Sequence, residues 1–345
     1  MQPVPFSQLT KALLDENKPF PPRYLHRLSD LNPEDAAQLA AAWGRTAAWR
    51  REALMEDLIE LSDADYVLSF EAVARIGLKD ENAPVRMMSI EMLADYELAD
   101  LIPNFLQMVE NDPDAEVRAR AATALGQYVY MGEVEELAET TLHKVEDCLL
   151  RVTSGGDAPL VRQRALESLG YSSREEVAAL IEAAYNARSK DWLATALLAM
   201  GRSGQERWGV SVLRMLDHAS TAVQVEAVTA AGQLELKEAK PELLAIARSV
   251  QSEELVRSAA IWALSEIGGP GVQQALEDLL EQADDDEEEF INEALENLAF
   301  TEDLGLFSLI DLNEADLDAD DADEFAPPRE DGEKKAARKR RKKEQ

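Results

Sequence analysis

The chain has 345 residues, of which 46% are hydrophobic, and it carries 16 glycines, 14 prolines, one cysteine and a formal net charge of -33. The single cysteine, Cys148, excludes an internal disulfide framework, and the glycine and proline content is too low for a low-complexity protein. An electrostatic field of this sign repels nucleic-acid phosphate and anionic lipid, which argues against a folded body that lies on DNA, RNA or a membrane surface.

Residues 1–44 are predicted to form a helical N-terminal cap. Helical patterns cover residues 6–14 and 33–42, and the proline-rich stretch 19–22 separates them. No basic segment followed by an apolar run occurs near the start, so no secretory signal is expected. No stretch approaches the roughly 18 uncharged apolar residues of a membrane helix. We therefore expect a cytoplasmic protein without a membrane contact.

A short pattern recurs between residues 45 and 310, and it defines the predicted fold. Each copy has an apolar residue, usually followed by arginine, with small or apolar residues four and eight positions later, as in Val117, Arg118, Ala121 and Leu125. The copies begin at Trp49, Val85, Val117, Val161, Trp192, Val223, Val256 and Phe290. They are about 33 residues apart, and a second helical pattern precedes each copy, which is typical of helical repeats. The chain is therefore predicted to be all-α, a right-handed α-solenoid of about eight helix pairs.

One interval between copies is longer than the others. It contains an insertion, residues 128–152, whose helical pattern predicts a lengthened helix pair. Several copies also end in glycine, at positions 126, 170, 201 and 232. Two interpretations of these glycines stay open: a left-handed residue that ends the helix, or a close contact between helices.

The repeated pattern resembles HEAT repeats, in particular the short bacterial type first noted in phycobilin lyases, over roughly residues 45–300. The resemblance implies that the second helix of each pair lines a concave side, and that Asp and Arg residues of successive repeats form a ladder. The matching residues are Asp80 with Arg86 and Asp112 with Arg118, and Arg50, Arg162 and Arg257 hold the same arginine position. Later copies carry Leu193, Gln224 and Ile291 there, so the ladder should be interrupted. We interpret these arginines as structural rather than ligand-binding.

Residues that could carry catalysis or bind a metal are few and far apart. His26, His143 and His218 lie in different repeats, and one cysteine cannot complete a zinc site with them. His143 and Cys148 share a predicted helix but lie about 140° apart around its axis. The acidic run 284–289 lacks the spacing of a calcium-binding loop. We predict no catalytic residue, no metal site and no cofactor, and we do not expect an enzyme.

The concave face is where we predict partner binding. Counted from the first residue of each copy, positions 0, +1, +4, +5 and +8 form the core face, and positions +3, +6 and +10 lie opposite. The candidate partner-binding residues at these opposite positions are Arg120, Gln127, Arg164, Tyr171, Leu198, Arg202 and Trp262, and Glu167, Thr195 and Glu226 occupy equivalent positions. Arginine and aromatic residues are enriched in binding hot spots. In an alternative that stays open, Leu198 and Trp262 are buried against the preceding helix pair.

Residues 311–345 are predicted to form a disordered, charged C-terminal tail, because they cannot bury enough apolar surface to fold. The tail is acidic over residues 311–324 and ends in a basic cluster. The basic residues are Lys334, Lys335, Arg338, Lys339, Arg340, Arg341, Lys342 and Lys343. They could make a weak contact with nucleic acid or the ribosome, or pair with the acidic part of the same tail.

The favoured hypothesis is a non-catalytic scaffold or adaptor that binds another protein through its concave face. Two alternatives are retained. The first is a nucleic-acid- or ribosome-associated factor that uses the basic tail. The second is a chromophore chaperone or enzyme of the bilin-lyase kind, although a repeat that serves as a scaffold does not bring an activity with it.

Overall fold

The computed structural model describes residues 5–94, 96–284 and 287–301, and every regular element in these ranges is a helix. The chain divides into two compact units between Ala263 and Leu264. The boundaries predicted after residues 44 and 310 stay predictions. The predicted tail, with its basic cluster at residues 334–343, lies outside the described residues.

The first unit contains the helices up to α15, whose last residues belong to the second unit. Its α-helices are α1 (Phe6–Leu14), α2 (Pro33–Trp43), α3 (Ala48–Ala64), α4 (Glu71–Gly77), α5 (Ala83–Ala94), α6 (Ile102–Asn111), α7 (Ala115–Glu133), α8 (Glu139–Ser154), α9 (Pro159–Leu169), α10 (Glu175–Tyr185), α11 (Lys190–Arg202), α12 (Gly209–Leu213), α13 (Thr221–Gln233), α14 (Lys240–Arg248) and α15 (Glu254–Ile267). The short 3₁₀ turns are η1 (Pro22–Leu28), η2 (Ala99–Leu101), η3 (Glu206–Trp208) and η4 (Lys237–Ala239).

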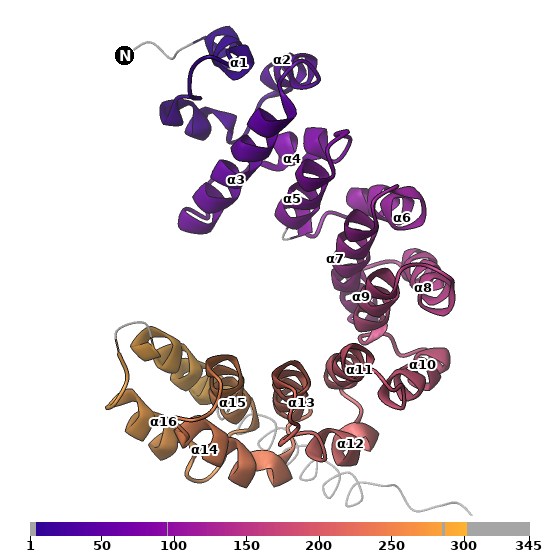
Figure 1. Cartoon of the computed structure of the whole chain (residues 1–345), viewed down its shortest axis with the longest axis vertical. Helices are drawn as coiled ribbons and strands as arrows, with labels where there is room; N and C mark the ends of the chain where they lie inside the picture. The colour runs from indigo at the N-terminus through magenta and orange to yellow at the C-terminus, as the bar shows by residue number, and fades with distance from the viewer. Residues whose placement is uncertain (1–4, 95, 285–286, 302–345) are drawn as a thin grey trace, which may run out of the picture. The chain divides into compact units, whose positions relative to one another are not determined.

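Helices of the first unit form two layers (Figure 1). In the layer that we call inner, α3, α5, α7, α9, α11 and α13 lie side by side, each in contact with the next. In the outer layer, α4, α6, α8, α10 and α12 each pack on the following inner helix. This arrangement confirms the predicted all-α stack of helix pairs. The second unit contains the end of α15, α16 (Val272–Leu280) and a further helix at residues 287–301.

Local sequence signals start several of these helices. The Asn32 side chain accepts a hydrogen bond from the backbone N–H of Asp35 at 2.9 Å, and Pro33 follows as the first helical residue of α2. The Asp114 carboxylate accepts from the backbone N–H of Glu116 at 2.8 Å and begins α7. Such side chains satisfy N–H groups that have no partner within the helix.

The core follows the repeated pattern. Val117, Ala121 and Leu125 are completely buried, as are the equivalent residues of the copies that begin at Val85, Val161 and Val223. The starting residues Trp192 and Phe290 are part-buried, and the first copy departs most from the pattern, because Trp49 is 54% exposed whereas Arg50, Arg51 and Leu54 are buried. The predicted start at Trp49 is therefore wrong by one residue, and the pattern in α3 begins at Arg50.

An arginine–aspartate ladder joins successive repeats in the first half of the stack. Arg51 contacts Asp80 with 2.7 Å between Nε and Oδ2, and Arg86 donates two hydrogen bonds of 2.8 Å to Asp112. Arg118 donates to Asp157 at 2.7 and 2.9 Å. The predicted ladder is confirmed, with Arg51 in place of Arg50, whose Nη2 donates instead to the carbonyls of residues 15 and 18.

Within the described residues, the copy after Arg118–Asp157 does not continue the ladder, although Arg162 holds the arginine position there, so the interruption comes one copy before the first missing arginine, at Leu193. Arg162 donates from Nε to the carbonyl of Thr153 at 2.9 Å, and its guanidinium lies 5.3 Å from the ring centre of Trp192. Arg257 donates from Nε to the carbonyl of Ala247 at 2.9 Å. Both arginines donate hydrogen bonds to backbone carbonyls of the preceding helix, which supports the interpretation that their role is structural.

The insertion lengthens two neighbouring helices. α7 has 19 residues and α8 has 16, so the extra residues extend the second helix of one pair and the first helix of the next.

The glycines that end the copies serve close contacts. A Cβ atom on Gly170 would lie 2.9 Å from the Cα atom of Ala199, and one on Gly201 would lie 2.9 Å from the Cα atom of Ala230. Neither has a left-handed backbone, so the close-contact interpretation is confirmed there.

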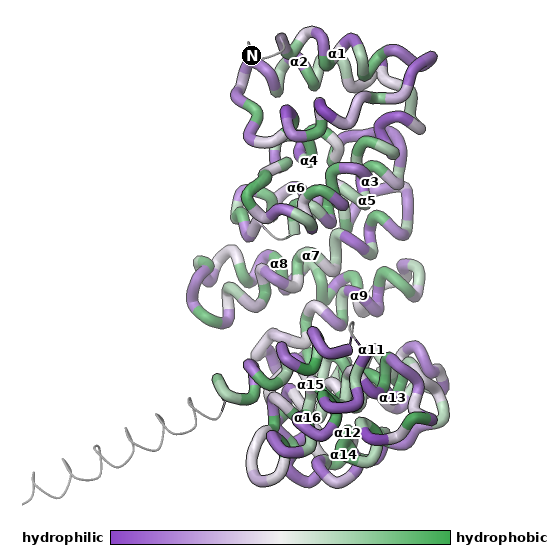
Figure 2. Tube along the Cα trace, turned by 90° about the vertical axis from the view of Figure 1, so that its left-hand side faces the viewer, coloured by the Kyte–Doolittle hydropathy of each residue, from purple (hydrophilic) through white to green (hydrophobic). Residues whose placement is uncertain are grey.

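The helices mix hydrophobic and hydrophilic residues along their length (Figure 2). Among the described residues, no helix is both long enough and apolar enough to cross a membrane.

Candidate functional site

Two adjoining cavities lie along the inner layer of the first unit, and together they form what we call the inner groove. The first has a volume of about 650 Å³ and is lined by α3, α5, α7 and the segment 66–69. The second has a volume of about 400 Å³ and is lined by α5, α7, α9 and α11. Both cavities share Arg120, Thr123 and Arg202, so the groove is continuous.

Six of the seven candidate residues on the predicted concave face lie along this groove. Arg120, Gln127, Tyr171 and Arg202 line the first cavity. Arg164 and Leu198 line the second, together with the shared arginines. These six residues therefore face one surface, although their role in binding a partner stays a prediction.

The seventh candidate, Trp262 on α15, is 36% exposed and lines none of the three cavities described here. Burial also departs from the prediction at two equivalent positions. Glu167 and Thr195 are 7% and 3% exposed, because they contact each other between α9 and α11. The Thr195 hydroxyl donates to Glu167 Oε1 at 2.9 Å, and Arg164 Nη1 lies 2.6 Å from Glu167 Oε2.

Sequence reasoning missed the aromatic end of the groove. Tyr66 and Val67, which follow α3, are 94% and 85% exposed, and Tyr96 follows α5. All three line the first cavity. They lie in connecting segments, so the helical positions could not identify them. One sequence signal could have identified this end of the groove. Tyr66 and Val67 are large apolar residues next to each other in a connecting segment.

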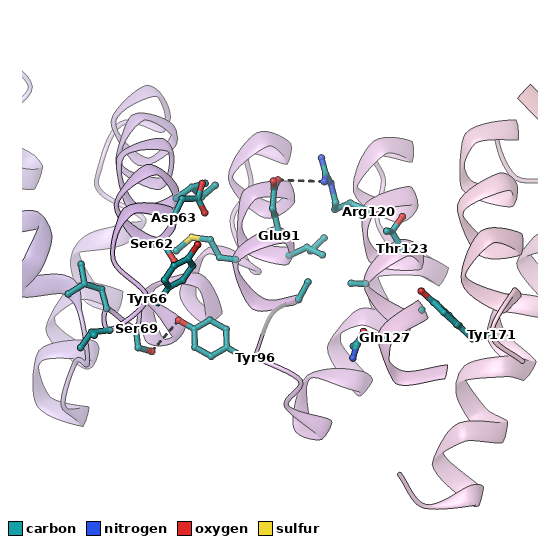
Figure 3. Close-up of a pocket in the computed structure, with 18 of the residues that line it drawn as sticks. Ser62, Asp63, Tyr66, Ser69, Glu91, Tyr96, Arg120, Thr123, Gln127 and Tyr171 are labelled. Carbon is teal, nitrogen blue, oxygen red and sulfur yellow. Dashed lines mark hydrogen bonds and ion pairs between the residues drawn. The ribbon is translucent and has the colours of Figure 1, made fainter. Parts of the chain in front are cut away.

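Figure 3 shows two polar contacts in the walls of the first cavity, one between Ser69 and Tyr96 and one between Glu91 and Arg120. The Tyr96 hydroxyl lies 3.2 Å from Ser69 Oγ and accepts a hydrogen bond from the backbone N–H of Phe70 at 3.1 Å. Arg120 lies across from Glu91, with 3.6 Å between Nη1 and Oε2, and both side chains are about half exposed. Arg120 is therefore held loosely and is accessible from the groove.

A stacked pair is already in place where the two cavities meet. The guanidinium carbon of Arg202 lies 5.0 Å from the ring centre of Tyr171, and Arg202 Nη1 donates to the carbonyl of Glu167 at 2.9 Å. The ring of Tyr171 meets the ring of Tyr130 edge to face, with 5.5 Å between centres. Such contacts hold the arginine and the aromatic ring in one orientation before any partner binds.

The residues that could carry chemistry lie apart from the groove. Cys148 is buried in α8, and burial raises the pKa of its thiol to about 11. His143 contacts Glu139 at 4.0 Å on the exposed side of α8, and His218 Nδ1 accepts from the backbone N–H of Ser220. Among the described residues, no three His, Cys, Asp or Glu side chains are grouped so that they could hold a metal ion.

The model for the family of HEAT repeats matches two segments of the sequence, residues 71–150 and 210–299. The chain contains HEAT repeats. Both segments cover helix pairs whose core residues follow the repeated pattern, and the first contains the Arg86–Asp112 step of the ladder. No curated protein sequence matches the chain.

Solved structures with similar folds include the complex of CpcE and CpcF of phycocyanin lyase from Nostoc sp. PCC7120, at 18% identity and a TM-score of 0.45 over 66% of this chain and 94% of that chain. YibA from Escherichia coli matches at 17% identity and a TM-score of 0.42, over 80% and 96% of the two chains. Human deoxyhypusine hydroxylase matches at 17% identity and a TM-score of 0.33, over 86% and 96%. None of these similarities is close enough to carry a function over to the HEAT repeats of this chain.

Glu226, on the repeat that follows the groove, has an unusually high pKa for a carboxylate. Glu226 on α13 is part-buried, and burial together with the negative charge of Glu167 raises its pKa to about 7, against the lowering effect of Arg202 and Arg164. In the described part of the chain it makes no hydrogen bond or ion pair. A carboxylate in this position is harder to ionise than one in water.

Replacing Glu226 with glutamine is expected to stabilise the HEAT repeats by about 2 kcal/mol at pH 8. The folded state binds this proton more tightly than the unfolded state, whose pKa is near 4.5, so stability falls as the pH rises from about 4.5 through about 7. Urea denaturation at pH 5 and pH 8 measures the difference. The variant should lose most of this pH dependence, and Glu182→Gln, on the exposed face of α10, should keep it.

Proposed function

We propose that this chain is a non-catalytic interaction protein whose inner groove binds an extended segment of another protein. The observation that carries the proposal is the aromatic first cavity, whose lining includes exposed Tyr66 and Val67 together with the Arg202–Tyr171 pair. Isolated exposed apolar residues are common, but these line a cavity of about 650 Å³ together with arginine and tyrosine.

Preorganisation supports this function. Tyr96, Tyr171 and Arg202 are each fixed by contacts within the protein, so a bound segment would order few side chains of the groove. When less conformational entropy is lost on binding, more of the contact energy contributes to affinity.

The lining of the groove contains no histidine or cysteine, which supports binding rather than catalysis. We propose a cytoplasmic location, with which the single buried thiol of Cys148 is compatible.

Site-specific photocrosslinking in the source organism identifies the bound segment. A benzophenone side chain at Thr123, exposed in the groove, should crosslink to one protein, which mass spectrometry then identifies together with the contacting peptide. The same side chain at Gln107, exposed on the outer helix α6, is the matched control. Equal capture of the same protein at both positions would contradict binding in the groove.

The identified peptide then permits a binding measurement. The double variant Tyr66→Ser, Val67→Ser should bind it at least about 10-fold more weakly, because it removes the exposed apolar rim of the first cavity. Val250→Ser is the control, since Val250 is 97% exposed and lies outside the cavity lining. Both variants alter exposed side chains, so unfolding midpoints should stay unchanged. Similar affinities for the two proteins would count against the proposed function.

A further inference from the structure

A third cavity, of about 750 Å³, continues the inner groove toward α13, and we call it the carboxylate pocket. Leu160, Arg164 and Glu167 line both this pocket and the second cavity of the groove. Its rim carries Leu160 and Leu255, which are 38% and 70% exposed. A chain segment that lies in the groove can therefore place a side chain in this pocket.

The charges that face the pocket are unbalanced. Its lining contains three carboxylates, those of Glu167, Asp191 and Glu226, and one guanidinium, that of Arg164. The single cation, Arg164, already forms an ion pair with Glu167, with 2.6 Å between Nη1 and Oε2. Arg202, the other nearby cation, donates to a backbone carbonyl of α9 and stacks on an aromatic ring. Glu226 is therefore left without a counter-ion of its own among the described residues.

The groups around Glu226 come from three elements. α9 contributes Arg164 and Glu167, α11 contributes Asp191 and Arg202, and on α13 Glu226 is the sole charged residue. From α15 only Leu255 reaches the lining. Part-burial of a carboxylate costs free energy that a bound cation would offset.

We propose that the carboxylate pocket binds an arginine side chain of the partner segment, with Glu226 as its counter-ion. The proposal rests on the proposed function, since the same segment occupies the groove. The apolar stem of the arginine would contact Leu160 and Leu255, and its guanidinium would reach Glu226. Arginine fits better than lysine because guanidinium is more weakly hydrated and pairs with carboxylate in a planar, two-bonded geometry. The net charge of -33 attracts a basic partner from a distance.

A small probe tests the pocket without the partner. N-acetyl-arginine methylamide is titrated into the full chain at pH 8, and methyl NMR signals of Leu160, Val225 and Leu255 report binding. N-acetyl-citrulline methylamide, which has the same shape without the charge, is the control ligand. The arginine compound should produce saturable shifts, and the citrulline compound should not. Equal binding of both compounds would overturn the proposal.

Variants and pH give the second part of the test. E226Q should bind the arginine compound at least about 10-fold more weakly, and E182Q should bind it like wild type. Between pH 8 and pH 6 wild-type affinity should fall about 10-fold, because Glu226 becomes protonated, whereas the residual affinity of E226Q should not change with pH. An unchanged affinity of E226Q at pH 8 would overturn the assignment to Glu226.

These results separate the pocket from the proposed function. Tyr66→Ser with Val67→Ser alters only the first cavity, so it should leave binding of the arginine compound unchanged. Glu226-dependent binding of the compound, in a protein whose groove captures no partner, supports the pocket and overturns only the proposed function.

Discussion

Replacing Arg86 with methionine is expected to lower the free energy of unfolding by about 3–5 kcal/mol, the range measured when one partner of a buried ion pair is removed. Arg86 and Asp112 are 9% and 7% exposed and share two hydrogen bonds of 2.8 Å. Arg86 Nη1 also donates to the carbonyl of Asp80 at 2.8 Å. The variant keeps an apolar side chain of similar length but leaves a buried carboxylate and a buried carbonyl without these donors.

Arg120→Met is the matched control, because Arg120 lies on the next inner helix and faces the groove. Its contact with Glu91 is 3.6 Å long and about half exposed, so its loss should cost less than about 1 kcal/mol. Urea denaturation, followed by circular dichroism, measures both variants. Equal destabilisation of the two would show that the ladder contributes no more than a surface pair.

The sequence predicted the layers and the core because both depend on local periodicity. Val117, Ala121 and Leu125 are buried because their spacing places them on one side of a helix, whatever that helix packs against. The same rule brought Arg120 and Arg164 to the groove. These predictions needed no knowledge of distances between helices.

The sequence-based predictions were wrong or incomplete where contacts between residues far apart in the chain determine the position of a side chain. Arg50 and Arg51 are both buried, and only Arg51 reaches Asp80, which is 29 residues further along the chain. Nothing in the local pattern distinguishes the two arginines. The aromatic end of the groove was missed for a related reason, since Tyr66 and Tyr96 lie in connections whose path no periodicity describes.

Close helix contacts explain the remaining difference between prediction and structure. Gly170 lets the end of α9 approach the backbone of Ala199 on α11, where a Cβ atom would lie 2.9 Å away. Glu167 and Thr195 lie between the same two helices and are therefore buried, although their helical positions face the groove. The sequence showed the glycine but left open how it was used.

The close approach of α11 and α13 leads to the second prediction. Gly201→Val should lower the free energy of unfolding by about 3 kcal/mol, at the upper end of what an overpacked core costs. A Cβ atom there would lie 2.9 Å from the Cα atom of Ala230, which is backbone and cannot rotate away. Gly201→Ala should destabilise less, since it adds one methyl group, whereas Gly44→Ala should be neutral because nothing lies within 4 Å of its Cβ position.

The effect of Gly201→Val should also be local, because each repeat of a stack is stabilised mainly by its neighbours. Weakening the contact between α11 and α13 should uncouple the repeats on its two sides. Hydrogen exchange followed by mass spectrometry should then show faster exchange in α11 and α13, while α5 and α7 keep their protection. Uniformly faster exchange in all four helices would mean that these repeats unfold as one cooperative block, and that the glycine contact is not a boundary within it.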